Sequence, residues 1–486
     1  MLGFQVRWYG FALTALVIFL GFGSRQGLAQ NSRAADFDVA WERTGLVAIG
    51  CRPKGEVIVG DATATRPPPT RMSWGVLWDQ EGHVLGATAL LGAPQQYDFE
   101  AWRLLEQGRW EYIEDVQWVG GDSWTGFTVL KIAMDASTRS SSTTIVLGDS
   151  AEVQLGALGV PGEPRLWLLS GARQFFAAEA GNSEQRGLYE PGEKVDRPRW
   201  IYDYGGMVEV RALDRSQHFG PGPAFGDQGE FLGWILPWRW QRSDPDSQLL
   251  ITWNTHLTRV VNELVEGKRP EFGFLGVRPR DISDAVKKEV DFGVSVYEVG
   301  QRTPAQSAGL QFGDVITHVN QEEVRSSQEL LWLLGMLAPL DQVELQVVRG
   351  VRTDRPKFPK VNVTLAKRYV PRPDYGLPPT ATFDGIEVDW ATASPRFSKD
   401  WQKIDTRGAV VVIRVDESSP AWEAGLREGD FISEVDGISI ERPRDFETHW
   451  LKIKGDVELR VNSGPNQLAR VLLFPRLDDA PAKDEP

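Results

Sequence analysis

Five histidines are the side chains in this sequence best suited to act as a general base near neutral pH. They are His83, His218, His256, His318 and His449. Ser216 lies two residues before His218, so both side chains would share one face of a strand, and a hydroxyl beside an imidazole is the beginning of a nucleophilic pair. Catalysis also needs an acid that orients the imidazole, and we assign none. We therefore favour a structural role for both residues, with a catalytic pair as the alternative.

Metal and redox chemistry are not expected. The histidines are scattered, without a pair at metal-ligand spacing. Cys51 is the single cysteine, so the chain can form neither an intrachain disulfide nor a paired-cysteine metal site. Because Cys51 follows the apolar residues 46–49, we expect it to be a small buried residue of a strand. We predict no metal and no cofactor.

Length and charge limit the function classes. A chain of 486 residues is too long for one core, so several domains are expected. It carries 53 Lys and Arg against 67 Asp and Glu, a net charge of −14, without a cluster of basic residues. Nucleic-acid binding needs such a basic face, so nucleic acid is not an expected partner.

The N-terminus has the pattern of an export signal, which we assign to residues 1–29. Arg7 gives a short positive segment, residues 9–23 are apolar, and cleavage after Ala29 would follow small residues. The apolar run is shorter than the ~20 residues that span a bilayer. We predict an exported, periplasmic or extracytoplasmic protein, with an uncleaved N-terminal membrane tether as the alternative.

Two segments with different hydrophobic periods follow the signal. Residues 37–245 contain short apolar runs separated by Gly and Pro, which favours an all-β sandwich or barrel. From about residue 247 the apolar residues recur at spacings of three and four, as in an amphipathic helix, and Gly267 is a plausible helix end. We expect a connector helix within 246–270.

An internal repeat is the most informative feature. Residues 303–316 read TPAQSAGLQFGDVI and residues 419–432 read SPAWEAGLREGDFI, with the same spacing of Pro, Gly and Gly-Asp. In each copy a Thr or Ser can cap a short helix with Pro at its first position. Glycine then ends the helix, and Gly-Asp turns the chain into a strand. A second helix is expected from Ser326 in one copy and from Pro443 in the other, before a closing strand.

This ordered set resembles the PDZ domain in the form found in bacterial proteases. The resemblance places PDZ domain 1 (PDZ1) at residues 271–367, a linker at 368–379, PDZ domain 2 (PDZ2) at 380–476 and an acidic tail at 477–486. It implies that an extended peptide adds as a strand to a sheet edge, with its terminal carboxylate held by backbone N–H groups and its last side chain in an apolar pocket.

In PDZ1 the carboxylate loop matches Phe274, Leu275, Gly276 and Val277, which is similar to the family pattern of aromatic, aliphatic, glycine and aliphatic residues. Glycine there lets the backbone approach the carboxylate. Leu330 and Leu334, one helical turn apart, can line the groove opposite the loop or belong to the core, and both interpretations stay open.

In PDZ2 the equivalent loop includes Gly385 and Ile386, between Asp384 and Glu387. Two acidic side chains beside a carboxylate site would repel the ligand. PDZ2 is therefore expected to bind internal segments, to pack on another domain or to be structural.

The junction at residues 267–277 resembles the connector between the protease and PDZ domains of the HtrA/Do (DegP-like) serine proteases. Three landmarks of the trypsin-like fold can be placed by resemblance, within residues 79–91, 126–132 and 218–233. They put the family's catalytic His, Asp and Ser at Ala89, Gly126 and Gly220. Alanine and glycine have no side chain that can act as base, orienting acid or nucleophile.

The fold class that follows is mainly β: a degenerate trypsin-like double β-barrel and then two α+β PDZ domains. We predict that the chain is not an enzyme but a pseudoprotease with an adaptor or chaperone-like role in envelope protein quality control. Expected partners are peptides or protein C-termini, with unfolded proteins, active HtrA homologues and a homo-oligomer as further candidates. The alternatives are an active HtrA-type serine endopeptidase with a non-standard catalytic set, and a structural envelope protein whose PDZ domains bind nothing.

Overall fold

A computed structural model gives the structure of most of the chain after residue 44. It describes residues 45–55, 69, 71–87, 94–105, 109–113, 115–122, 124–134, 144, 166–169, 175–180, 207–212, 222–226, 229–235, 247–351, 353, 355–370, 382–394, 410–463 and 469–476. The predicted signal, most of the predicted linker and the acidic tail lie outside these residues. None of the helices formed by the described residues is both long and apolar enough to cross a bilayer.

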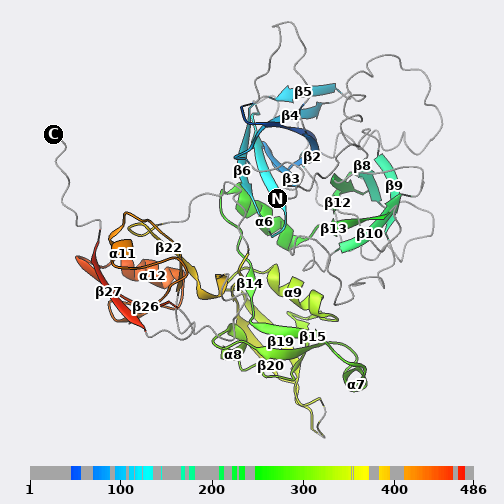
Figure 1. Ribbon diagram of the computed structural model, residues 1–486. Helices are drawn as coiled ribbons and strands as arrows, with labels where there is room; N and C mark the ends of the chain where they lie inside the picture. Colours follow the sequence, from blue (N-terminus) through cyan, green and yellow to red (C-terminus); the bar gives the residue numbers. More distant parts are fainter. Residues whose placement is uncertain are drawn as a thin grey trace, which may run out of the picture.

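The N-terminal part is β-rich, as predicted, and contains two sheets (Figure 1). The first is a seven-stranded antiparallel sheet in the order β5-β4-β1-β2-β3-β7-β6. Its strands are β1 Leu46–Pro53, β2 Arg71–Leu77, β3 His83–Ala87, β4 Tyr97–Leu105, β5 Arg109–Ile113, β6 Val116–Gly121 and β7 Phe127–Ile132. Cys51 is buried in β1, where burial raises the pKa of its thiol to about 12. This fits a packing role for Cys51 rather than a nucleophilic one.

The second sheet closes into a barrel in the order β10-β13-β12-β11-β8-β9. Its strands are β8 Leu166–Leu169, β9 Phe175–Ala180, β10 Met207–Ala212, β11 Gly222–Phe225, β12 Phe231–Ile235 and β13 Ser247–Thr252. The helical period assigned from residue 247 onward was wrong at its start, because residues 247–252 pair with both β10 and β12. Leu250 and Ile251 point to opposite faces of β13 and are both buried, so the apolar residues here do not show the alternation that identifies a strand.

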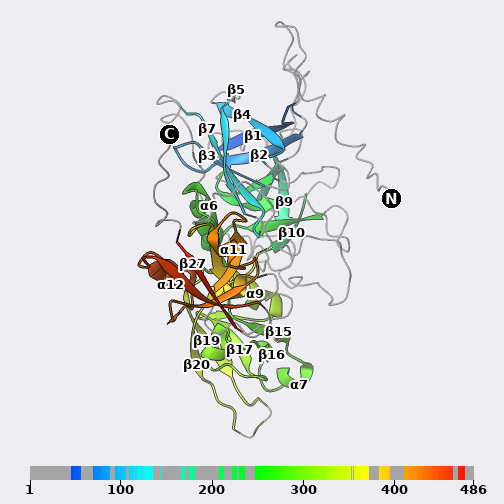
Figure 2. The same ribbon diagram turned by 60° about the vertical axis from the view of Figure 1, so that its left-hand side comes forward.

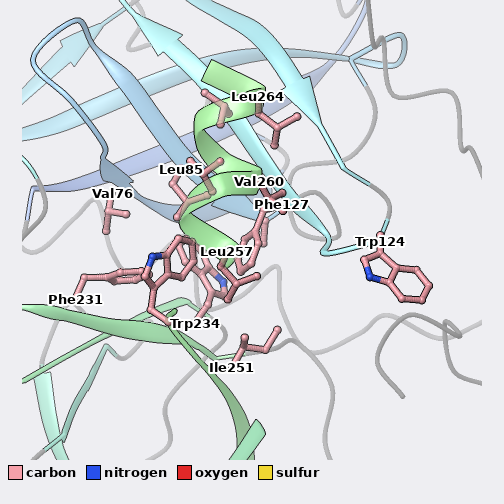
Figure 3. Packing of buried hydrophobic residues seen from close by; sticks show 14 of the residues in the cluster. Val76, Leu85, Trp124, Phe127, Phe231, Trp234, Ile251, Leu257, Val260 and Leu264 are labelled. Carbon is pink, nitrogen blue, oxygen red and sulfur yellow. The ribbon is translucent and has the colours of Figure 1, made fainter. Parts of the chain in front are cut away.

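The connector helix α6 is shorter than predicted and spans Thr255–Val265. Asn254 caps it, since its side chain accepts a hydrogen bond from the Leu257 N–H, and Gly267 follows its end with a positive φ of 69°. Its buried residues Leu257, Val260 and Leu264 point into a shared core with aromatic side chains of both sheets, including Phe127 and Trp234 (Figure 3). The helix therefore joins the two β units into one packed body.

PDZ1 contains a five-strand path β15-β16-β17-β19-β20, and PDZ2 repeats it as β22-β23-β24-β26-β27. The PDZ1 elements are β14 Gly273–Phe274, β15 Val277–Asp281, α7 Asp284–Lys287, β16 Val294–Val299, α8 Pro304–Ser307, β17 Val315–Val319, β18 Glu322–Glu323, α9 Ser327–Gly335, β19 Gln342–Val348, β20 Lys360–Thr364 and β21 Ala366–Lys367. The PDZ2 elements are β22 Ile386–Trp390, η6 Ala391–Ala393, β23 Val410–Val415, α11 Pro420–Glu423, β24 Phe431–Val435, β25 Ile438–Ser439, α12 Pro443–Trp450, β26 Asp456–Asn462 and β27 Arg470–Pro475. Both short helices begin where the repeat predicts, capped by the Thr303 and Ser419 hydroxyls.

PDZ1 is attached to the β-rich part through the C-terminal end of α6 and the chain that follows it (Figures 1 and 2). The Arg259 guanidinium donates to the backbone oxygens of Glu271 and Met336, at 3.1 and 3.0 Å. Phe272 packs on Trp124, in the turn between β6 and β7, with 5.9 Å between the ring centroids. These contacts fix the position of PDZ1 relative to the barrels.

Candidate peptide-binding site

The PDZ1 loop at residues 274–277 has the backbone geometry of a carboxylate site. Gly276 has a positive φ of 91°, and a Cβ at this position would lie 2.2 Å from the Cβ of Thr303, so only glycine fits. The Leu275 and Gly276 carbonyls accept hydrogen bonds from the N–H groups of Ala305 and Gly300, at 2.8 and 2.9 Å. These bonds hold the loop against the adjacent turn. Within the described chain, the N–H groups of Leu275 and Gly276 have no hydrogen-bond acceptor. A bound carboxylate could accept from them.

A groove of about 270 Å³ opens beside this loop. One wall is β15, which stands at the end of the PDZ1 sheet and can accept a further strand. The other wall is the second half of α9, where Leu331 and Leu334 line the groove. Leu330 instead lies in the PDZ1 core, fully buried, so the groove-lining residue is the next one along the chain.

Residues from outside the repeat complete the groove. Arg368 and Tyr369 of the linker and Thr392 of PDZ2 line it as well. The Arg368 guanidinium lies 4.5 Å from the ring centroid of Trp124, which anchors it over the groove. Arg278 also lines the groove, whereas acidic side chains are absent from its described lining. The site is therefore apolar with a positive rim, a property that the motif alone did not reveal.

The PDZ2 loop is closed on itself. Asp384 and Gly385 both have positive φ, 52° and 83°, and the Ile386 N–H donates to the Phe383 carbonyl at 2.9 Å. The Asp384 carboxylate lies 3.2 Å from the Arg476 guanidinium, with both side chains nearly buried. The charge of Asp384 is therefore compensated within PDZ2. The sequence analysis expected this acid to repel a ligand and did not foresee the pairing with Arg476.

Glu387 is compensated too, since Arg414 Nε lies 3.4 Å from its carboxylate. Ile386 is fully buried in the PDZ2 core instead of lining a groove. Aromatic rings fill the space beside it: Phe383 packs on Phe446 at 5.5 Å and Phe446 stacks on Trp450 at 5.0 Å between ring centroids. The end of PDZ2 that would take a terminal side chain is occupied by its own residues.

Of the three positions aligned with a catalytic triad, Gly126 is described, while Ala89 and Gly220 lie outside the described residues. Gly126 precedes β7 in a turn with a positive φ of 74°, and its N–H donates to the Asp122 carbonyl at 2.9 Å. The Asp122 carboxylate accepts hydrogen bonds from the N–H and hydroxyl of Thr125, both at 2.6 Å. Burial nevertheless raises the pKa of Asp122 to about 6. Asp122 thus fixes the turn before β7.

His83 is held in the hairpin between β2 and β3. Its Nδ1 lies 2.7 Å from the Asp79 carboxylate, and the side chain is almost fully buried. The pair links the two ends of a short turn, so His83 has a structural role at the start of β3. Ser216 and His218 lie outside the described residues.

Two stretches of the chain match the PDZ domain family, residues 273–356 and residues 411–450. A protein of Chlamydia trachomatis named "Probable periplasmic serine endoprotease DegP-like" is 28% identical over 212 residues, which cover 42% of this chain and 40% of the relative. A Brucella suis protein of the same name is 25% identical over 338 residues, 68% of this chain and 60% of the relative. The chain thus spans less than two thirds of the length of these relatives.

Among solved structures, an "HtrA-type protease AlgW with tripeptide" is similar with a TM-score of 0.46 and 17% identity, covering 71% of this chain and 99% of that one. A second, "HtrA-type protease AlgW with decapeptide", has a TM-score of 0.43 and 18% identity, covering 70% of this chain and 100% of that one.

The relatives overturn one prediction. The expectation that the chain is not an enzyme is wrong, because the similar proteins are named serine endoproteases, and this favours a protease. We based the expectation of an inactive chain on three aligned positions alone. Two of them, Ala89 and Gly220, lie outside the described residues. The assignment of Ala89, Gly126 and Gly220 to the triad positions stays a prediction.

Proposed function

Because the chain is a member of the HtrA (DegP-like) family of serine endoprotease homologues with C-terminal PDZ domains, we propose that it captures peptides and cleaves them outside the cytoplasm. The PDZ1 groove carries this proposal. Its loop presents two N–H groups without acceptors in the described chain, next to an apolar pocket and an edge strand. The periplasmic designation of the relatives supports the location.

Each part of the groove has a role in this proposal. The terminal carboxylate of the ligand accepts from the Leu275 and Gly276 N–H groups, and its last side chain lies against Leu331 and Leu334. The ligand backbone extends β15 by one strand. Arg368 adds a positive charge that favours a terminal carboxylate over an amidated end.

Cleavage requires a nucleophile and a base. The positions aligned with the triad supply neither, so we propose a catalytic set made from other residues. Ser216 and His218, the one close serine–histidine pair singled out by the sequence, are the first candidates. A holding role for unfolded protein segments needs only the groove and would operate beside cleavage.

Binding is tested first, with the full chain and a library of fluorescent C-terminal peptides. Peptides with an apolar last residue and a free carboxylate are expected to bind. Leu331→Glu places a carboxylate in the groove at a partly exposed position, and we expect it to weaken binding at least about tenfold. Lys287→Glu, on the exposed helix α7, is the matched control, because it adds negative charge away from the groove and should leave binding unchanged. Equal binding of amidated peptides would refute carboxylate capture.

Cleavage is tested separately with unfolded casein and a fluorophosphonate probe. Casein cleavage and probe labelling that are lost in Ser216→Ala and in His218→Ala would support the proposed pair. His449→Ala, on α12 of PDZ2, is the matched control and should leave both unchanged. Absence of cleavage in the unaltered chain would overturn the enzymatic part while leaving peptide capture intact.

A further inference from the structure

The first residue of the PDZ1 carboxylate loop is in contact with PDZ2. Phe274 packs against an apolar cluster of PDZ2 whose buried members are Ala391, Val411 and Phe431, with Ile413 beside them. These residues come from η6, β23 and β24, so the contact joins two domains that are separate in the sequence. We propose that PDZ2 positions this loop and is thereby a fixed part of the PDZ1 peptide site, an inference that rests on the capture of chain ends proposed for PDZ1.

The PDZ2 sheet is apolar on the face that receives Phe274. Val411 of β23 pairs with Phe431 of β24, so both side chains point to the same face of the sheet. Val410 and Val412 point to the other face and belong to the PDZ2 core. β23 is therefore apolar on both faces, and each face needs a covering that excludes water. PDZ1 supplies the second covering.

The corresponding face of PDZ1 is different. Ser295 and Tyr297 of β16 occupy the repeat positions of Val411 and Ile413, and the register of the neighbouring strands is the same. Tyr297 is 43% exposed. A PDZ sheet of this repeat therefore does not need an apolar face here, and the apolar residues of PDZ2 serve the contact with PDZ1.

Polar contacts hold PDZ2 at the same place. β21 pairs with β14, so Lys367 stands directly opposite Gly273, the residue before Phe274. Lys367 Nζ lies 2.8 Å from the Asp389 carboxylate of β22, with side chains only 12% and 7% exposed. The Thr392 hydroxyl donates to the Lys367 carbonyl at 2.7 Å. Both the side chain and the backbone of Lys367 are therefore bound to PDZ2, next to the loop.

An open cleft lies beside this contact. It has a volume of about 740 Å³ and is lined by the first turns of α12 on the PDZ2 side and by residues 267–269 of the connector on the other. Where the cleft is open, α12 does not touch the connector. The contacts at Phe274 and Lys367 are therefore the ones that place PDZ2 against the loop.

Anchoring of Phe274 acts on a donor of the carboxylate site. The Phe274 carbonyl and the Leu275 N–H belong to one planar peptide unit, so a rotation of the Phe274 backbone would turn this N–H away from the ligand. Thr392 also lines the groove, on the side of Leu334 and Gly335, and so limits the space for the last side chain. A loop that is held in position spares the ligand the cost of ordering it.

The test compares the same substitution at two PDZ2 positions in the full chain. Val411→Ser removes an apolar contact behind Phe274, at a residue outside the groove lining. The repeat carries Ser295 at this position in PDZ1, so the fold accommodates serine there. Val471→Ser, on β27 where the side chain is 60% exposed, is the matched control.

Fluorescence anisotropy measures the affinity for a C-terminal peptide with an apolar last residue and for its amidated form. We expect Val411→Ser to lower the preference for the free carboxylate about tenfold, because the Leu275 N–H is no longer held toward it. A domain that is only less stable would lose both peptides equally and keep the preference. Val471→Ser should leave the preference within about twofold. An unchanged preference in Val411→Ser, or an equal fall in Val471→Ser, would overturn the proposed role of PDZ2.

Two further variants separate positioning from a loss of folding. Val411→Ile keeps the apolar contact, so affinity for the free-carboxylate peptide should stay within about threefold of the unaltered chain. Asp389→Asn keeps the shape of the side chain but removes the charge that pairs with Lys367, and we expect the carboxylate preference to fall about fivefold. Retention of the full preference in Asp389→Asn would count against the proposal.

Hydrogen exchange gives a measurement that needs no peptide. The N–H groups of Gly300 and Ala305 donate to the Gly276 and Leu275 carbonyls, so loosening of the loop should speed their exchange at least about tenfold in Val411→Ser. Val471→Ser should leave both rates unchanged. If the unaltered chain binds no chain end while exchange is still faster in Val411→Ser, the proposed peptide capture fails and the positioning of the loop by PDZ2 is supported.

Discussion

PDZ1 and PDZ2 have the same strand order, the same capped short helix and the same turn into the following strand, yet their cavities lie at opposite ends of the strand–helix groove. In PDZ1 the cavity lies at the loop and the second half of α9. In PDZ2 it lies at the end of β22 and the first half of α12. A shared topology therefore does not determine which part of a PDZ groove is open.

Side-chain volume at two repeat positions accounts for part of this difference. Leu330 and Leu334 of PDZ1 correspond to Phe446 and Trp450 of PDZ2, at the same spacing from the Gly-Asp turn. Phe446 and Trp450 are buried and stack on each other, occupying the space beside the loop. The smaller leucines leave that space open in PDZ1.

The largest difference between the domains is expected at the loop glycines. Gly276→Ala forces a Cβ to within 2.2 Å of Thr303, whereas at Gly385 the nearest atom would be 3.0 Å away. We expect Gly276→Ala to weaken C-terminal peptide binding by about a hundredfold or more. Gly385→Ala, measured in the same anisotropy assay, should leave it within about twofold. Equal effects would show that both loops take part in the capture of chain ends.

The aromatic filling of PDZ2 can be removed. Trp450→Leu leaves a cavity where the indole is 1% exposed, so we expect a loss of about 2–3 kcal/mol in the unfolding free energy of PDZ2. Urea unfolding followed by circular dichroism measures it. The reverse change, Leu334→Trp in PDZ1, should block the groove and lower peptide affinity. A Trp450→Leu variant of unchanged stability would contradict the assignment of this residue to the PDZ2 core.

Neutralising Asp384 in the PDZ2 loop is expected to lower the unfolding free energy by a smaller amount. Asp384→Asn removes the charge that pairs with Arg476, whose side chain is 8% exposed. Because Asn keeps an acceptor oxygen, we expect a loss of about 2 kcal/mol, below the cost of removing a buried ion-pair partner completely. The measurement is again urea unfolding, with Asp436→Asn in the exposed turn after β24 as control. A stabilised variant would restore the view that Asp384 is an uncompensated charge.

The smallest difference is expected at the Gly-Asp turns. Arg349 pairs with Asp314 and donates to the Gly309 carbonyl, and Arg470 does the same for Asp430 and Gly425. We expect Arg349→Met and Arg470→Met each to cost about 1 kcal/mol, since both arginines are partly exposed. Thermal unfolding of the two variants would test this equivalence. A difference of more than about 2 kcal/mol between them would show that the pairs do not have the same role.

The sequence was sufficient for features that depend on neighbouring residues. Caps at Thr303 and Ser419, the glycine after α6 and the helices α9 and α12 follow from local patterns, and the structure confirms them. It failed where burial on both sides of a strand imitates a helical period, as in β13. The groove itself was predicted only in part, because Leu331 rather than Leu330 faces it.

The sequence by itself determined the repeat and the glycine at position 276, where the backbone conformation and the nearby Thr303 leave no room for a side chain. Only the tertiary structure decided which charges are compensated and which cavities stay open. Arg470 and Arg349 come from different positions in the repeat and still reach equivalent aspartates, so the repeat spacing could not reveal the shared pairing. Likewise, Lys367 and Thr392 shape the two clefts because domains that are separate in the sequence pack together in space.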